Sequence, residues 1–143
     1  MWPWYQQAFC DSFAELGYEV SGFSWNSIFW NRNDDDDIVS KSIFYKLQYK
    51  FLIGPTINKL NKTLIDKVIN EKPEVVFFYN CQHIKPQIFK RIKAYSKIIQ
   101  YYNDDPFSRK QTKFMWRFSK KSIKYSDLNI VFRKKNIKDF NQN

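Results

Sequence analysis

The chain has 143 residues, the length of a single domain, and 43% of them are hydrophobic, which is enough apolar material for a core. No stretch approaches the roughly 18 consecutive apolar residues of a membrane-spanning helix. The N-terminus lacks the basic and apolar regions of a secretory signal. The two cysteines, Cys10 and Cys81, have no metal-binding or redox spacing, so we expect reduced thiols in a cytoplasmic protein.

The net charge of +10 is concentrated in the C-terminal quarter of the chain. Residues 1–108 carry 13 Lys and Arg against 12 Asp and Glu, whereas residues 109–143 carry 11 against 2. Such a basic segment attracts phosphate groups, nucleic acid or an anionic lipid surface. A solvated helix face is the commoner origin of such a segment, so the charge alone leaves these alternatives open.

The N-terminal part predicts a helix, a strand and a loop. Apolar residues at helical spacing indicate a helix over 4–17, with Gly17 as its C-cap. Alternation over 18–25 indicates a strand. The four aspartates of Asp34–Asp37 indicate a solvated loop, because the Gly and Glu that an EF-hand needs are missing.

Two helices are predicted next, separated by Gly54 and Pro55. The first covers 40–53, and the second is capped by the Thr56 side chain and ends at Lys72. One face of the second helix is apolar, formed by Ile57, Leu60, Leu64, Ile65 and Val68.

Strands and helices alternate in the remainder of the chain. Strands are predicted over 75–79, which we expect to be buried on both faces, over 97–102 and over 128–132. The helices between and after them begin near Pro86, Arg109 and Ile137. The inward residues that we expect on the first two of these helices are Ile88, Phe89, Ile92, Phe114, Met115 and Phe118.

This alternation predicts an α/β fold, specifically a Rossmann-like three-layer domain with a mainly parallel sheet. The chain opens on a helix, without the strand that normally begins such a sheet, and its last helix has barely started when the sequence stops. We therefore expect residues 1–143 to be a partial domain of a longer protein, truncated at both ends.

Polar side chains follow three of the predicted strands. The turn Asn103–Ser108 contains two adjacent carboxylates, Asp104 and Asp105, directly after the strand 97–102. Because the carboxyl ends of parallel strands meet at one edge of a sheet, this turn should lie beside the loops 80–83 and 133–136. The sequence therefore predicts a site for a polar ligand at this edge.

Each candidate residue also has a structural interpretation. Asp104 and Asp105 could contact a polar ligand, or they could only form an Asx turn and a helix cap. His83 could be a general base or a loop hydrogen-bonding group. Side chains suited to binding substrate are Asn80, Gln82, Asn103, Ser108, Arg133 and Lys134. No glycine-rich phosphate loop, HExxH, CxxC or nucleophile elbow is present, and no metal site is predicted.

Several segments resemble a known enzyme family in the same order along the chain. They are Lys72–Phe78 (KPEVVFF), Tyr102–Ser108 (YNDDPFS), and Tyr125–Asn136 with its YSDL and FRKKN. They resemble the N-terminal half of bacterial GT-B glycosyltransferases, closest to CgeB-like and related enzymes of surface-polysaccharide pathways. Ala14–Val20 (AELGYEV) is similar to the family's opening segment. The similarity covers about residues 8–140, and Asn103–Ser108 is its most specific piece.

The resemblance implies transfer of a sugar from a nucleotide-sugar donor to a saccharide or lipid-linked acceptor. It implies that residues 1–143 form part of the acceptor-side half, that the nucleotide-sugar half is absent, and that this part is inactive alone. Enzymes of this type generally need no bound metal or other cofactor besides the nucleotide-sugar co-substrate. The carboxylates Asp104 and Asp105 would then act on hydroxyl groups rather than hold a cation.

A binding module is the alternative function. In that interpretation the basic helix 109–124, with Phe114, Trp116 and Phe118, contacts an anionic membrane surface or nucleic acid, the nucleic acid being the less favoured partner. The localisation would then be cytoplasmic and peripheral at the inner membrane face. A third interpretation is an inactive remnant of a truncated gene.

Overall fold

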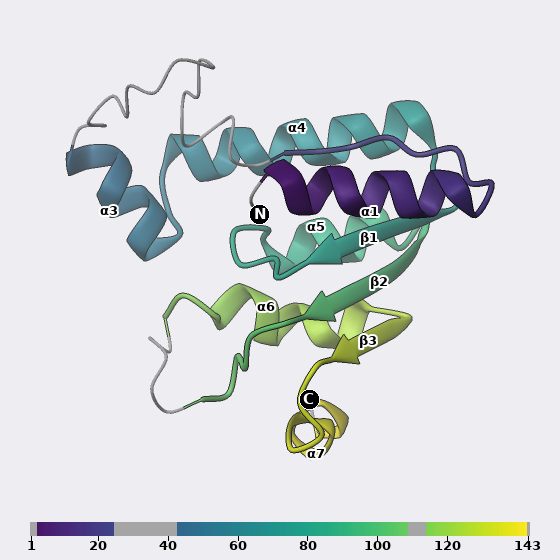
Figure 1. Cartoon of the computed structure of the whole chain (residues 1–143). Helices are drawn as coiled ribbons and strands as arrows, with labels where there is room; N and C mark the ends of the chain where they lie inside the picture. The colour runs from purple at the N-terminus through teal and green to yellow at the C-terminus, as the bar shows by residue number, and fades with distance from the viewer. Residues whose placement is uncertain (1–2, 25–42, 109–113, 143) are drawn as a thin grey trace. The chain divides into compact units, whose positions relative to one another are not determined.

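The computed structural model describes residues 3–24, 43–108 and 114–142 (Figure 1). The chain divides into two compact units, residues 1–42 and residues 43–143, and each is described by itself.

The first unit contains helix α1 (Pro3–Glu15), and Gly17 follows it with a left-handed φ of 86°. The Gly17 amide donates to the Ala14 carbonyl over 2.9 Å, and the Tyr18 amide donates to the Phe13 carbonyl over 3.1 Å. This pair of hydrogen bonds is a Schellman motif, which satisfies two of the last free carbonyls of the helix. The predicted helix and its glycine C-cap are confirmed.

The strand predicted over 18–25 is wrong for residues 18–24, which form no strand. A strand needs a neighbouring strand to take its backbone hydrogen bonds, and α1 is the one regular element that the structure describes in this unit. Alternating side chains are therefore not sufficient here. Trp25, the aspartate run Asp34–Asp37 and the predicted helix start at 40–42 lie outside the described residues.

The second unit is an α/β fold with a three-stranded parallel sheet flanked by helices, as predicted (Figure 1). The strands lie in the order β1-β2-β3, with Val75 opposite Lys97 and Ile99 opposite Leu128. The elements in chain order are α3 (Ile43–Phe51), α4 (Pro55–Glu71), β1 (Val75–Tyr79), α5 (Pro86–Ile92), β2 (Lys97–Tyr102), α6 (Arg117–Ser122), η1 (Ile123–Tyr125), β3 (Leu128–Val131) and α7 (Asn136–Asn141).

Helix α4 begins differently from the prediction. Its N-cap is Gly54, at φ 106°, and Pro55 occupies the first turn. The Thr56 backbone amide donates to the Gln48 Oε1 atom over 2.8 Å. The N-cap residue, a glycine, contributes no side-chain hydrogen bond to the helix. The predicted Thr56 cap is wrong because the buried Gln48 side chain, arriving from α3, already satisfies a free amide of the first turn.

One part of the core lies between α5 and the sheet, with the apolar face of α4 packed on α5. The Phe78 ring of β1 packs on the Phe89 ring of α5, with centroids 4.6 Å apart. The predicted burial of β1 on both faces is wrong, because Val75 is 45% exposed while Phe78 is buried. The predicted inward residues of α4 and α5 are all buried: Ile57, Leu60, Leu64, Ile65, Val68, Ile88, Phe89 and Ile92.

The basic helix is shorter in the structure than the predicted 109–123. Residues 109–113 lie outside the described part, residues 114–116 form a turn, and α6 begins at Arg117. Trp116 is fully buried against Tyr102, Ile123 and Phe140, whereas Phe114 is 37% exposed. The large Trp116 indole fills the core beside β2. Phe114 and Lys121 are therefore among the exposed side chains of this segment, and Trp116 is not.

Candidate functional site

The carboxyl ends of β1 and β2 are joined by the side chain of Asn80, the residue after β1. Its Oδ1 atom accepts the backbone amides of Asn103 (3.0 Å) and Asp104 (3.3 Å), and its Nδ2 atom donates to Asp104 Oδ2 over 3.0 Å. Asn80 has a left-handed φ of 44°, which asparagine tolerates better than most residues. This clamp holds the exposed Asp104 carboxylate at the end of the sheet.

The neighbouring Asp105 is buried and joins the same turn to the loop after β3. Its Oδ1 atom accepts the Phe107 amide (3.0 Å) and the Asn136 Nδ2 group (2.6 Å), and its Oδ2 atom pairs with Lys135 Nζ over 2.7 Å. The bond to Phe107 is the Asx turn considered above. Asp104 and Asp105 thus differ completely in surroundings, although they are adjacent in sequence.

The partners of Asp105 determine its ionisation. Burial by itself raises the pKa of Asp105, but the Lys135 ammonium, the Phe107 amide and the Asn136 amide all favour the charged form. Together they outweigh burial and lower the pKa below the ordinary aspartate value. Asp105 is therefore a charged carboxylate whose acceptor atoms are occupied within the protein.

His83 lies on the inner side of the loop that follows β1. Its side chain is buried, and its ring packs on the Tyr49 ring of α3 with centroids 4.6 Å apart. Its carbonyl accepts Asn61 Nδ2 over 3.0 Å, and Asn61 Oδ1 accepts the Lys85 amide over 2.7 Å. Burial lowers the pKa of His83 to about 4, so the imidazole is neutral at pH 7.

The other predicted site residues lie at the same edge of the sheet with different exposure. Gln82 and Ser108 are half-buried, and Asn103 is exposed. Arg133 and Lys134 are exposed, and their carbonyls accept the amides at the start of α7, those of Asn136 (2.9 Å) and Ile137 (3.2 Å). The structure thus links Asn80, Asn103 and Asp104 directly, and it links Asp105 to the loop that carries Arg133 and Lys134.

A network of buried polar side chains lies next to the carboxyl end of β2. The Tyr102 hydroxyl donates to Gln100 Oε1 over 2.9 Å, and Gln100 Nε2 donates to Ser126 Oγ over 2.5 Å. Ser119 of α6 donates to the Cys81 carbonyl, and burial raises the pKa of the Cys81 thiol to about 12. Burial thus favours the protonated thiol at neutral pH.

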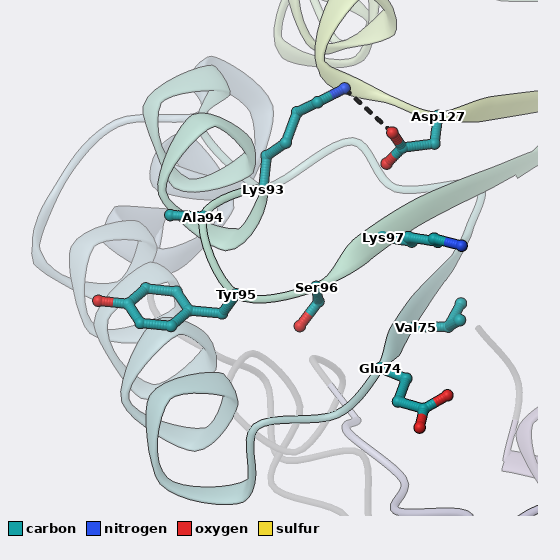
Figure 2. A pocket seen from close by; sticks show the side chains of 8 residues that line it. All are labelled: Glu74, Val75, Lys93, Ala94, Tyr95, Ser96, Lys97 and Asp127. Carbon is teal, nitrogen blue, oxygen red and sulfur yellow. Dashed lines mark hydrogen bonds and ion pairs between the residues drawn. The ribbon is translucent and has the colours of Figure 1, made fainter.

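A shallow depression of about 530 Å³ lies at the opposite, amino-terminal edge of the sheet (Figure 2). Lys93 pairs there with Asp127 over 3.2 Å, and the second oxygen of Asp127 accepts the Ile98 amide over 2.8 Å. Ser96 Oγ donates to the Pro73 carbonyl over 2.6 Å. These polar groups fasten the strands to their connections, so we assign the depression a structural role.

The contacts of three residues that shape the site were not predicted, although two of these residues, Lys135 and Asn136, belong to the predicted loop 133–136. Lys135 and Asn136 bind Asp105, and Asn61 holds the His83 loop on α4. The available signal for Asn61 is a polar side chain on the otherwise apolar face of α4, where it is buried. Lys135 carried no such signal, since it stands in a run of basic residues.

Three further findings concern metal ions, the membrane and known proteins. Over the described ranges, no cluster of three or more His, Cys, Asp or Glu side chains is arranged to hold a metal ion. In those same ranges, no helix combines the length and the apolar character needed to cross a bilayer. No protein family, curated protein or solved structure matches this chain.

Proposed function

We propose that this chain is the acceptor-side part of a glycosyltransferase that transfers a sugar from a nucleotide-sugar to a saccharide or lipid-linked acceptor. The observation that carries the proposal is the Asn80 clamp, which holds an exposed carboxylate, Asp104, at the carboxyl edge of a parallel sheet. Ligands of open α/β folds bind at this edge. The similarity of Asn103–Ser108 to the GT-B turn agrees with it.

The two carboxylates take different roles in this proposal. Transfer requires removal of a proton from the acceptor hydroxyl while positive charge develops on the donor sugar. Asp104 is the carboxylate that can accept a hydrogen bond or a proton from a hydroxyl, because it is exposed. Asp105 holds the turn, since its oxygens are occupied by Lys135, Asn136 and Phe107.

The remaining site residues have supporting roles. Asn103 and the half-buried Gln82 and Ser108 offer amide and hydroxyl groups for further hydroxyls of the acceptor. The exposed cations Arg133 and Lys134 suit an anionic group, either the phosphate of a lipid-linked acceptor or the leaving diphosphate of the donor. On this proposal the nucleotide-sugar is the only co-substrate, and its binding half belongs to a further domain.

Replacing Asp104 with alanine is expected to weaken saccharide binding about tenfold or more, because a hydrogen bond to a charged group contributes about 1.5–3 kcal/mol. Binding is measured by two-dimensional ¹H–¹⁵N NMR during titration with a mixture of methyl glucoside, methyl galactoside and methyl N-acetylglucosaminide. In the unmodified chain the amide signals of Asn80, Asn103 and Asp104 should move.

Asp66→Ala is the matched control, because Asp66 is an exposed carboxylate on α4 that pairs with Lys62. This variant should bind the glycosides as the unmodified chain does. UDP-glucose alone should leave the three amide signals in place, since the donor half is elsewhere. Unmoved signals with all three glycosides, or equal binding by Asp104→Ala, would contradict the proposal.

The binding-module alternative receives less support from this arrangement. It relied on Phe114, Trp116 and Phe118 as the apolar side of the helix 109–124, and the Trp116 indole is fully buried in the core. Among the described cations of this segment, Lys121 and Lys124 are exposed, but its largest aromatic side chain does not face outward.

A further inference from the structure

Helix α3 carries an apolar stripe on its outward side. Ile43, Leu47 and Phe51 recur every four residues, so they lie on one face of the helix, and they are 76%, 45% and 40% exposed. Ile53, directly after the helix, is 57% exposed. Four exposed large apolar side chains within residues 43–53 are unusual for a surface without a partner.

The opposite side of α3 fixes the helix to the second unit. Leu52 is fully buried, and Gln48 is buried and bonds the first turn of α4. The Tyr49 ring packs on His83. Because this side is committed to the core, the stripe cannot turn inward without breaking these contacts.

Positive charge borders the stripe. Lys46 and Lys50 are exposed and lie on one flank of it at helical spacing. On α6, Arg117 donates to the Phe51 carbonyl over 2.8 Å and stacks on the Phe114 ring at 4.0 Å. Phe114 meets Phe51 edge to face, with centroids 5.6 Å apart, so the apolar surface continues toward the basic segment.

We propose that this surface, formed by Ile43, Leu47, Phe51, Ile53 and Phe114 and called the α3 stripe, binds an anionic lipid surface. An apolar helix face bordered by lysines is the pattern of a helix that lies in the membrane interface, with apolar side chains among the acyl chains and cations at the headgroups. The chain's net charge of +10 favours an anionic membrane and opposes pairing with a second copy. This inference does not depend on the proposed glycosyltransferase function.

The proposed membrane contact differs from the one predicted from the sequence. The predicted contact was the helix 109–124, whose Trp116 is buried. On this proposal α3 supplies the apolar contact. Arg117 and Lys121 are cations of α6, and α6 contacts α3 where Arg117 donates to the Phe51 carbonyl.

Vesicle sedimentation tests the proposal. The full chain is expected to sediment with vesicles of phosphatidylglycerol and phosphatidylcholine and to remain in solution with pure phosphatidylcholine. Raising the salt from about 0.05 M to about 0.5 M should weaken binding because it screens the lysines. Leu47→Ser should lower the partition coefficient about tenfold, since a leucine side chain no longer enters the interface.

Ile137→Ser is the matched control, because Ile137 is an aliphatic residue on α7 that is 49% exposed, similar to Leu47. It should sediment as the unmodified chain does. A double change, Lys46→Glu with Lys50→Glu, should abolish binding to anionic vesicles, and thermal melts establish that every variant is folded. The proposal is overturned if the chain does not sediment with anionic vesicles, or if Leu47→Ser sediments as the unmodified chain does. It is also overturned if light scattering shows a dimer that the Leu47→Ser change dissociates.

Discussion

Replacing His83 with glutamine is expected to remove most of the acid sensitivity of folding between pH 6.5 and about 4. Burial lowers the pKa of His83 from 6.5 to about 4. Between these pH values the unfolded chain holds a proton on His83 that the folded chain does not, so stability falls as the pH falls. A pKa difference of this size corresponds to about 3 kcal/mol in the free energy of unfolding. This contribution is present in full above pH 6.5 and is lost by about pH 4.

The measurement is urea unfolding of both proteins at pH 7, 5.5 and 4. Because His83 is the only histidine in the chain, the difference between the two pH profiles reports this one group. Tyr49, whose ring packs on His83, stays protonated over the whole range, and burial raises its pKa further. Parallel plots of stability against pH in the two proteins would contradict the prediction. They would show that the His83 imidazole is protonated to the same extent in the folded and the unfolded chain.

The parts of the fold that could be predicted from sequence are those determined by local patterns. The strand 97–102 and the strand 75–79 have the bounds that their apolar and β-branched runs indicate. Pro86 begins α5 because its fixed φ suits the first helical position. The meeting of the loops 80–83, 103–108 and 133–136 follows from parallel strands alone.

The parts that could not be predicted depend on partners far away in the sequence. The difference between Asp104 and Asp105 arises because Lys135 and Asn136, about 30 residues later, reach only Asp105. The burial of His83 depends on Tyr49 and on Asn61, which come from two preceding helices. No local spacing contains this information, so the sequence does not distinguish Asp104 from Asp105 and does not predict that His83 is buried.

Replacing Asp105 with alanine is expected to lower the free energy of unfolding by about 3 kcal/mol. The change leaves the Phe107 amide and the Asn136 amide group without their acceptor in a buried place, and each such loss costs about 1–3 kcal/mol. The ion pair with Lys135 adds little, because the Lys135 side chain is 62% exposed. Most of the effect therefore comes from hydrogen bonds rather than from charge.

Asp104→Ala is the control for this experiment, because Asp104 is adjacent but exposed and should change stability by less than about 1 kcal/mol. Both variants are compared with the unmodified chain by urea unfolding at pH 7. Equal losses in the two variants would mean that the turn responds as a unit and that the contacts of Asp105 do not set its stability.

The pH dependence distinguishes Asp105 from His83. The partners of Asp105 lower its pKa below the ordinary value of 3.8, so its carboxylate contributes stability above about pH 4 and loses it as the pH falls through the lower folded value. In Asp105→Ala the free energy of unfolding should therefore fall less below pH 4 than it does in the unmodified chain. The decline between pH 6.5 and 4, which comes from His83, should be unchanged. His83→Gln should do the reverse. If Asp105→Ala flattened the profile above pH 4 instead, the carboxylate would be titrating there, and Asp105 rather than Asp104 would become the better candidate for exchanging a proton with a substrate hydroxyl.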